Sequence, residues 1–242
     1  MTLRSTISTA EGKRRYVRQL FATIADRYDF ITGFLSYGQD RRWKARLIAL
    51  AGLQPGDRVL DLACGTGDLA FAAAQRAHRA VGLDITHRML QLAAGRCGAG
   101  LHGPRGISWI TGDMLALPFG DARFDVVTTG YGLRNVPDLR QAIQEIRRVL
   151  SPGGRLLSLD FNRPEHPLVR AAYLTYLTGV GSALGTVLHG DPDTYRYIPE
   201  SIGQYPGAHG VARLLEAEGF EAVRVVPVFG GLLAIHTARK RA

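Results

Sequence analysis

Short apolar runs alternate with longer amphipathic segments through the middle of this 242-residue chain. The runs are too short for helices and most are bounded by turn residues, which predicts buried strands of a parallel sheet. The predicted strands span residues 59–62, 80–83, 107–111, 124–129 and 155–161. The helical patterns between them cover residues 68–77, 86–92 and 136–150. This alternation predicts a doubly wound α/β fold, in which ligands bind at the carboxyl ends of the strands.

The first 54 residues precede the first strand and have a different pattern. Residues 13–28 carry apolar side chains about four apart and predict a helix. Residues 28–38 are rich in aromatic side chains and predict a loop, which is either part of the core or the entrance to a flat, apolar substrate site. A second helix is expected from Asp40. We therefore expect residues 1–54 to form a helical cap.

The pattern changes again after the fifth predicted strand, where residues 162–206 interrupt the alternation. A helix over 211–218 and two strands over 222–228 and 232–237 then close the chain. The length suits one α/β domain that spans residues 1–242 and can bury a substantial core. We interpret residues 162–206 as an insertion on the substrate side of that domain.

Residues 171–188 contain no charged side chain. By length alone, such an 18-residue stretch is a candidate membrane span. Four Ser and Thr side chains dilute it, and no anchoring pattern frames it. We therefore expect a buried helical lid or a homodimer surface, with contact to a membrane as the alternative.

The net charge of +9 is concentrated near the N-terminus. Residues 1–50 hold ten Lys and Arg against four Asp and Glu, which leaves +6. Basic residues between 13 and 46 are either a peripheral contact with anionic membrane or an ordinary solvated surface. No nucleic-acid-binding signature is present, so no nucleic acid is expected. Cys64 and Cys97 are too few for a disulfide framework, and no signal-peptide core is visible, so we expect a cytoplasmic protein.

The turn between the first two strands carries the most informative chemistry. Gly65 and Gly67 allow a ligand to approach the backbone closely, and Asp84 at the tip of the second strand can accept two hydrogen bonds from a ribose diol. Asp61 and Asp68 make the turn acidic, which disfavours the pyrophosphate of a dinucleotide. A ligand with an amine and a sulfonium suits this turn better, so we expect S-adenosylmethionine rather than NAD. The alternative is an ordinary tight turn.

Several motifs resemble the ubiquinone/menaquinone biosynthesis C-methyltransferases over nearly the whole chain. The shared motifs are Tyr28-Asp29, Leu35-Ser36-x-Gly38, Trp43-Lys44, Asp61-Leu-Ala-x-Gly65-Thr-Gly67-Asp68, Leu117-Pro-Phe119, Gly132-Leu-Arg-Asn135, Val149-Leu-x-Pro-Gly-Gly154 and Tyr195-x-Tyr197. The resemblance implies the Rossmann-like fold of class I methyltransferases. That fold has a seven-stranded, mostly parallel sheet with an antiparallel last strand, here with a helical N-terminal extension and a helical insertion before strand six.

The resemblance also implies positions for the cofactor. Thr66 would contact the methionine part, Asp84 the ribose, and Asp113 and Met114 the adenine, with Gly130 beside the sulfonium. The full expected set is Asp61, Gly65, Thr66, Gly67, Asp84, Ile85, Asp113, Met114 and Gly130. The chain departs from the usual family residues at Thr32, Asp40, Asp113, Gly130 and Asp160. A glycine at 130 removes a hydroxyl that would otherwise be available to a ligand.

The implied reaction methylates a ring carbon of a polyprenylated hydroquinone. The ring carbon becomes nucleophilic when the neighbouring hydroxyl ionises, and the ordinary pKa of a phenol is about 10. We expect Arg134 to stabilise the phenolate, or to act only as a salt bridge that holds its loop. Tyr197 is a second catalytic candidate. The expected substrate contacts are Tyr28, Tyr131, Asn135 and Tyr195.

Three readings of the function stay open in the sequence. The first is C-methylation of demethylmenaquinol or of the corresponding benzoquinol. The second is methylation of another phenolic small molecule on the same fold. The third is a module that binds the cofactor or a lipid without catalysis. None of them needs a metal, and the seven histidines lack ligand spacing.

Overall fold

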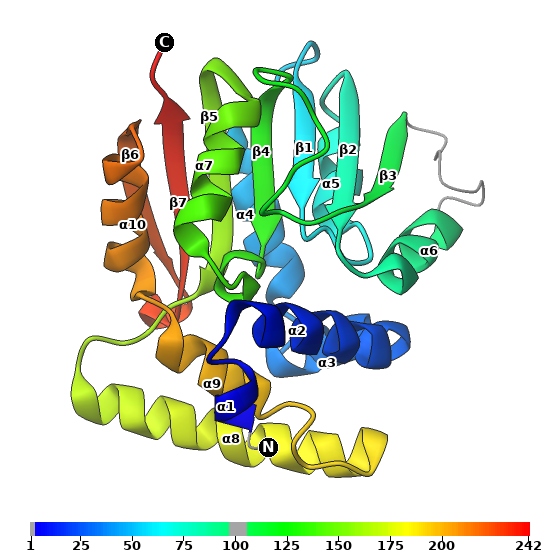
Figure 1. The fold of residues 1–242 in the computed structure, drawn as a ribbon, viewed down its shortest axis with the longest axis vertical. Coiled ribbons are helices and arrows are strands. Elements are labelled where there is room, and N and C mark those ends of the chain that lie inside the picture. Colours follow the sequence, from blue (N-terminus) through cyan, green and yellow to red (C-terminus); the bar gives the residue numbers. More distant parts are fainter. Residues whose placement is uncertain (1–2, 97–105) are drawn as a thin grey trace.

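A seven-stranded sheet forms the centre of the computed structural model, which describes residues 3–96 and 106–242. The strand order is β3-β2-β1-β4-β5-β7-β6 (Figure 1). The strands are β1 (Arg58–Leu62), β2 (Arg79–Asp84), β3 (Ile107–Thr111), β4 (Phe124–Gly130), β5 (Leu150–Phe161), β6 (Phe220–Val228) and β7 (Leu233–Lys240). Strands β1 to β5 pair in parallel, and β7 runs antiparallel to both of its neighbours. The predicted sheet is confirmed. Cys97 lies outside the described residues.

Helices cover both faces of this sheet, which explains why its central strands are mostly apolar. Helices α7 (Leu139–Val149) and α10 (Gly207–Ala217) lie on one face, and α4 (Asp40–Ala51) and α5 (Asp68–Ala74) lie on the other (Figure 1). Helix α6 (His87–Arg96) packs beside β2 and β3. In β4, Val127 packs with the α7 side and the adjacent Val126 with the α4 side. Because successive side chains point to opposite faces, both must be apolar.

The N-terminal cap contains two more α-helices than the sequence indicated, α1 and α3. Helix α1 (Leu3–Thr6) and helix α2 (Ala10–Ile24) lead through the 3₁₀ turn η1 (Ala25–Arg27) to α3 (Tyr28–Leu35). The prediction of a loop over residues 28–38 is therefore wrong for most of its length. Tyr28, Ile31 and Leu35 are spaced three and four apart and pack in one apolar cluster, which stabilises the helix. Other aromatic residues lie between these three positions, so the helical spacing is not visible in the sequence.

The insertion forms a layer below the carboxyl ends of the strands (Figure 1). It consists of the long helix α8 (Pro167–His189) and the short helix α9 (Tyr197–Gln204). Helix α8 is long and apolar enough to cross a membrane, yet it packs against α9. The expectation that residues 171–188 are buried is wrong, since only 17% of the most apolar window is buried. The inward side of α8 buries Leu177, Gly181 and Gly185, while several large apolar side chains elsewhere on the helix are exposed.

Candidate active site

The turn after β1 and the end of β2 build one wall of the site. Gly67 has φ +91°, and a Cβ there would lie 2.5 Å from the Trp109 ring, so only glycine fits this close packing. The backbone N–H groups of Gly65 and Thr86 donate to the two oxygens of Asp84 at 2.9 and 2.8 Å. These bonds fix the carboxylate at the tip of β2. Burial raises its pKa, and the two donors oppose that shift.

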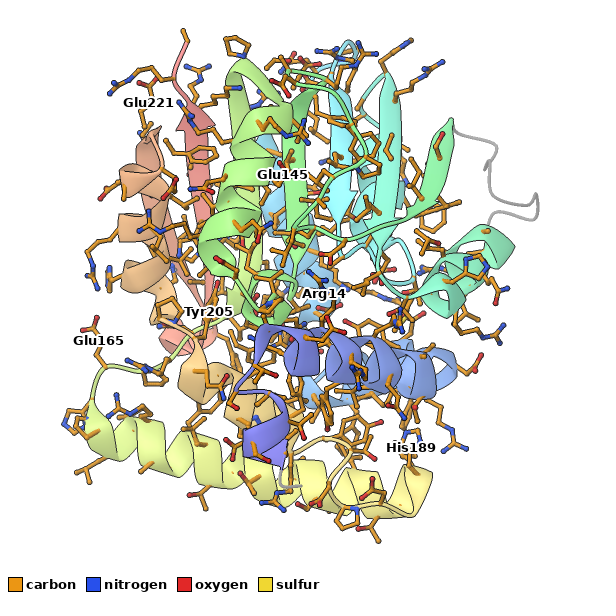
Figure 2. The ribbon with its side chains drawn as sticks, in the orientation of Figure 1. Arg14, Glu145, Glu165, His189, Tyr205 and Glu221 are labelled. Carbon is orange, nitrogen blue, oxygen red and sulfur yellow. The ribbon has the colours of Figure 1, made fainter. Side chains whose placement is uncertain are left out.

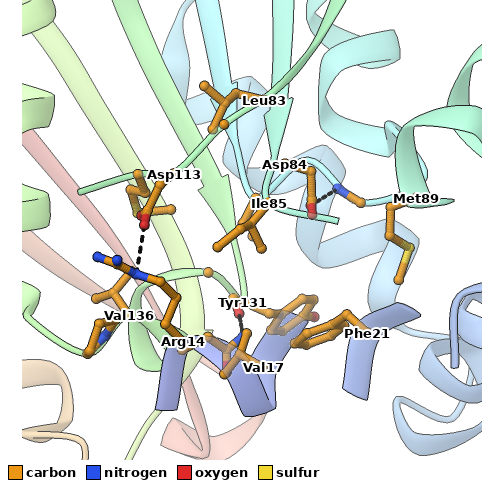
Figure 3. Close-up of a pocket in the computed structure, with 18 of the residues that line it drawn as sticks. Arg14, Val17, Phe21, Leu83, Asp84, Ile85, Met89, Asp113, Tyr131 and Val136 are labelled. Atoms are coloured by element: carbon orange, nitrogen blue, oxygen red, sulfur yellow. Dashed lines mark hydrogen bonds and ion pairs between the residues drawn. The ribbon is translucent and has the colours of Figure 1, made fainter. Parts of the chain in front are cut away.

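A pocket opens between this wall, the end of β4 and helix α2; we call it the strand-end pocket (Figure 3). Six of the predicted cofactor residues line it: Gly65, Asp84, Ile85, Asp113, Met114 and Gly130. Helix α2 covers the pocket with Val17 and Phe21. Arg14 of the same helix (Figure 2) forms a 3.0 Å ion pair with Asp113 (Figure 3). The pocket therefore has a carboxylate at each end and apolar walls between them.

The other three predicted cofactor residues lie off this pocket. Asp61 and Thr66 line a smaller side pocket that shares Gly65 and Gly130 with the strand-end pocket, and Gly67 lines neither. Asp61 is buried, Thr128 donates to its Oδ1 at 2.9 Å, and its Oδ2 has no partner among the described residues. Burial raises the pKa of Asp61 to about 7.

An apolar cavity of about 300 Å³ lies on the far side of Tyr28 and Tyr131. Most of its wall is apolar or aromatic and comes from α2, α3, α8 and the ends of β5 and β7. Five of the predicted catalytic and substrate residues line it, namely Arg134, Tyr195 and Tyr197 together with Tyr28 and Tyr131, which also line the strand-end pocket. Phe21, Tyr28 and Tyr131 line both spaces, so two ligands would meet at these three rings.

Arg134 is the buried cation of the apolar cavity. Its Nη1 atom lies 2.9 Å from Asp160 Oδ1 and donates to the Tyr131 carbonyl at 3.0 Å. Its Nε atom is buried and has no partner among the described residues. Burial disfavours the charge, but Asp160 outweighs that effect and raises the pKa of Arg134. Arg134 is thus a permanent cation that has both a structural partner and an unused donor.

The remaining catalytic and substrate candidates carry polar groups that lie in different parts of the site. The Tyr197 hydroxyl is buried and lacks a partner in the described chain. The Tyr195 hydroxyl lies 2.9 Å from His189 Nε2, and burial raises the pKa of Tyr195 to about 12. Asn135 lines the strand-end pocket instead of the apolar cavity, donates to the Tyr131 carbonyl, and has a buried Oδ1 without a partner in the described segments. The structure thus separates Asn135 from the two tyrosines.

Sequence reasoning missed the helix-borne residues that close the site. Lys13 is buried, and its ammonium donates to the carbonyls of Arg134 and Val136 at 3.0 and 2.8 Å. Burial and the charge of Arg134 lower the pKa of Lys13 to about 8. In the sequence, Lys13 and Arg14 were counted only among the basic residues between 13 and 46. The periodicity of α2 gives one signal, because Lys13 and the buried Val17 fall four apart on one face.

A second missed group lies under Tyr131. The Tyr131 hydroxyl donates to Asp40 Oδ1 at 2.7 Å, and Lys44 bridges Asp40 and Asp68 at 2.6 and 2.9 Å. This chain of contacts fixes the Tyr131 ring at the edge where the strand-end pocket meets the apolar cavity. Among residues 3–96 and 106–242, no three metal-binding side chains are grouped to hold a metal ion.

Comparison with known proteins decides the family. The model of the ubiE/COQ5 methyltransferase family matches residues 9–240. The chain belongs to this family. The methyltransferase is 40% identical over 229 residues to the 2-phytyl-1,4-naphtoquinone methyltransferase of Synechocystis, covering 93% of this chain and 94% of that protein. It is also 40% identical over 220 residues to the demethylmenaquinone methyltransferase of Thermus thermophilus, covering 90% and 98%.

Solved structures confirm the fold class of the methyltransferase. A SAM-dependent methyltransferase from Thermotoga maritima superposes with a TM-score of 0.65 at 18% identity, covering 93% of this chain and all of that one (100%). S-adenosylmethionine is the cofactor of the enzyme, and the strand-end pocket carries residues that could hold it. Asp84 lines the pocket and could accept the ribose hydroxyls, Ile85 and Met114 could cover a purine, and the unpartnered Asp61 Oδ2 in the side pocket could accept a cationic group.

Proposed function

We propose that this enzyme transfers the methyl group of S-adenosylmethionine to a ring carbon of a prenylated hydroquinone, and that the ring is a naphthoquinol. One observation carries the proposal: the strand-end pocket and the apolar cavity share the rings of Phe21, Tyr28 and Tyr131. A methyl donor in the first space and an aromatic acceptor in the second would meet across this boundary. Quinone C-methylation is the activity that the names of the relatives carry.

Arg134 supplies the electrostatic part of the reaction in this proposal. Its guanidinium lines the apolar cavity and keeps a free donor at Nε. A cation near one hydroxyl of the acceptor lowers the pKa of that hydroxyl below the usual value of about 10, so the phenolate forms more readily. The electron density of the phenolate then reaches the neighbouring ring carbon. The cofactor, when bound, supplies an electrophilic methyl group.

The tyrosines and Asn135 orient the acceptor. The unpartnered hydroxyl of Tyr197 offers a hydrogen bond to the second ring oxygen from within the cavity wall. Tyr28 and Tyr131 hold the ring plane by packing, and Tyr195 closes the cavity on the side of α8. Asn135 supports the loop between β4 and α7 through its bond to the Tyr131 carbonyl. Alignment of donor and acceptor is the main contribution of these residues.

The benzoquinol ring of the ubiquinone pathway is the second candidate. It is favoured by the 39% identity over 232 residues to a protein from Ectopseudomonas mendocina named ubiquinone/menaquinone biosynthesis C-methyltransferase UbiE, which spans 94% of this chain and 90% of that protein. Two relatives with 40% identity carry names that specify a naphthoquinone or demethylmenaquinone. We therefore place the naphthoquinol first.

The basic residues between 13 and 46 support a cytoplasmic enzyme that rests on the inner face of a membrane. Arg15, Arg18, Arg41, Arg42 and Arg46 are exposed and would attract anionic headgroups. Lys13 and Lys44 do not contribute, because both ammonium groups are occupied inside the fold. The contact surface is therefore smaller than the charge count suggested.

Product analysis tests the proposal. The enzyme is incubated with methyl-labelled S-adenosylmethionine and a panel of reduced acceptors: a short-tailed demethylnaphthoquinol, the matching benzoquinol and a simple phenol. We expect label on a ring carbon of the naphthoquinol, a slower reaction with the benzoquinol and none with the phenol. Label on an oxygen, or equal transfer to the phenol, would contradict the proposal.

A further inference from the structure

Large apolar side chains are exposed at one end of the molecule. We call this set the apolar face, and it lies on α3, the residue Tyr37 after it, α8 and the 3₁₀ turn η3 (Phe229–Gly231). Its members are Phe30, Phe34, Tyr37, Leu168, Val169, Tyr176, Val187 and Phe229. Among the described residues, only Leu50 on α4 is a comparably exposed large hydrophobic residue elsewhere. An exposed apolar group of this extent indicates an interaction surface.

Helix α8 presents one side to this face because its other side is packed. A Cβ at Gly181 would lie 3.2 Å from the Tyr195 Cβ, and a Cβ at Gly185 would lie 2.3 Å from the Asp191 carbonyl oxygen. The small residues therefore let the segment after α8 pack directly on the helix. A helix held along one side in this way lies across the end of the molecule (Figure 1) and does not span a bilayer by itself. Its outward surface between residues 171 and 188 carries no charge.

The apolar cavity opens on the apolar face. Tyr37, Tyr176 and Phe229 line the cavity, yet they are 62%, 47% and 46% exposed. The hydroxyls of Tyr37 and Tyr176 hydrogen-bond to each other, and the Tyr37 and Phe229 rings lie 6.5 Å apart. These three rings form the mouth of the cavity. A cavity of about 300 Å³ holds a ring and the start of a chain, so a long prenyl tail must leave through this mouth.

We propose that the apolar face docks on a lipid bilayer, so that the tail of the acceptor stays in the membrane while its ring enters through the mouth. This inference rests on the proposed function. A second copy of the chain is a poorer occupant, because it would cover the mouth and block the tail. Arg27, whose guanidinium donates to the Leu188 carbonyl, and Arg170 on the first turns of α8 place cations beside the face, where anionic headgroups would lie.

Vesicle binding of matched variants tests the docking surface. The triple variant Phe30→Ser/Phe34→Ser/Val187→Ser removes exposed side chains that line neither the strand-end pocket nor the apolar cavity. Leu50→Ser removes an exposed leucine from α4 and is the control. Each protein is sedimented with phosphatidylcholine vesicles, with and without phosphatidylglycerol. Methyl transfer is then measured on a tail-less naphthoquinol in solution and on a long-tailed one in the vesicles.

We expect the triple variant to lose at least tenfold in vesicle affinity and in turnover of the long-tailed acceptor, with unchanged turnover of the tail-less one. Leu50→Ser should match the unaltered enzyme in all three measurements. Vesicle binding of the triple variant equal to the unaltered enzyme would overturn the inference. So would a dimer, seen by light scattering, that the triple variant breaks without any vesicle binding. Vesicle binding without methyl transfer would instead reject the proposed function and leave the docking surface in place.

Discussion

The guanidinium of Arg134 lies between Asp160 and the ring of Phe161 on the wall of the apolar cavity. Its 2.9 Å ion pair with Asp160 is buried on both sides, with side chains 6% and 1% exposed. Removing one partner of a buried pair leaves an uncompensated charge and costs about 3–5 kcal/mol of stability. The salt bridge anticipated as the alternative role is therefore present, and the catalytic role has to be tested separately from it.

Arg134→Lys and Arg134→Ala separate the two roles. We expect both variants to bind S-adenosylhomocysteine with nearly unchanged affinity in calorimetry, because Arg134 does not line the strand-end pocket. Arg134→Ala should lose at least a hundredfold in turnover, and Arg134→Lys should keep part of it because a cation stays in the cavity. Full turnover in folded Arg134→Ala, whatever its melting temperature, would contradict the catalytic role.

Asp61 makes stability depend on pH. Its pKa is about 7 in the folded protein and 3.8 ordinarily, so the folded protein binds this proton more tightly than the unfolded chain does. The resulting stabilisation of the cofactor-free protein is complete below about pH 4. That contribution is lost as the pH rises through 7. The free energy of unfolding of Asp61→Asn minus that of the unaltered protein should therefore grow by about 1 kcal/mol between pH 6 and 8.

Asp125→Asn is the control for this titration. Arg58 donates to the Asp125 carboxylate and lowers the pKa of that group to about 2, so its ionisation does not change in the same interval. The stability difference caused by Asp125→Asn should be constant between pH 6 and 8 in denaturant titrations. A constant difference for Asp61→Asn as well would show that its carboxyl group is already ionised at pH 6.

At the scale of elements, helix α2 joins the two halves of the site. Arg14 reaches Asp113 beyond β3, and Lys13 donates to two carbonyls of the segment that carries Arg134. The helix covers the strand-end pocket while Phe21 also lines the apolar cavity. Movement of α2 therefore opens the pocket and loosens the Arg134 loop together.

Lys13→Met tests this link. Methionine keeps the apolar stem of the side chain but removes the three donors of the ammonium, so two carbonyls lose a charged partner. We expect backbone amides of α2 to exchange with deuterium at least tenfold faster and S-adenosylhomocysteine to bind about three- to tenfold more weakly. Arg15→Met is the control, since Arg15 is exposed and pairs only with Glu11 among the described residues. Equal effects of the two substitutions would reject the link.

Strands and helices were predictable from the sequence where their pattern of apolar residues fits only one kind of environment. The strands around Leu60 and Val127 are buried on both faces, so their continuous apolar runs have one interpretation. Helix α3 was missed because its aromatic residues serve both the core and the surface. Helix α8 was expected to be buried because the absence of charge does not distinguish a protein interior from an exposed apolar face. The roles of Lys13 and Arg14 depend on contacts to residues about one hundred positions away, which no local pattern encodes.

At the scale of the whole molecule, the proposed function assigns the cofactor site to the sheet and the acceptor site to the added helices. Strand ends hold Asp84 and the glycine turn, whereas α2, α3 and α8 build the apolar cavity. The solved methyltransferase from Thermotoga maritima is 18% identical, so this likeness shows the fold alone. A ligand in the strand-end pocket would contact both the strand ends and helix α2, so its binding would stabilise the folded chain.

Cofactor binding should therefore raise the melting temperature. A ligand at a hundredfold its Kd that binds only the folded state adds about 2.7 kcal/mol. For a chain of this size that corresponds to a rise of about 5–10 °C with S-adenosylhomocysteine. Asp84→Asn should lose most of the shift at the same ligand concentration. Glu221→Gln, on β6 far from the pocket (Figure 2), should keep it. A full shift in Asp84→Asn would exclude that carboxylate as the ribose acceptor.

The most direct measurement of the central claim is a crystal structure with S-adenosylhomocysteine and a short-tailed naphthoquinol bound together. We predict the ribose at Asp84, the ring against Tyr28 and Tyr131, and one ring hydroxyl within hydrogen-bonding distance of Arg134. The reacting ring carbon should lie about 3–3.5 Å from the position that the transferred methyl group would occupy. A naphthoquinol outside the apolar cavity, or one separated from the sulfur by the Tyr131 ring, would contradict the account.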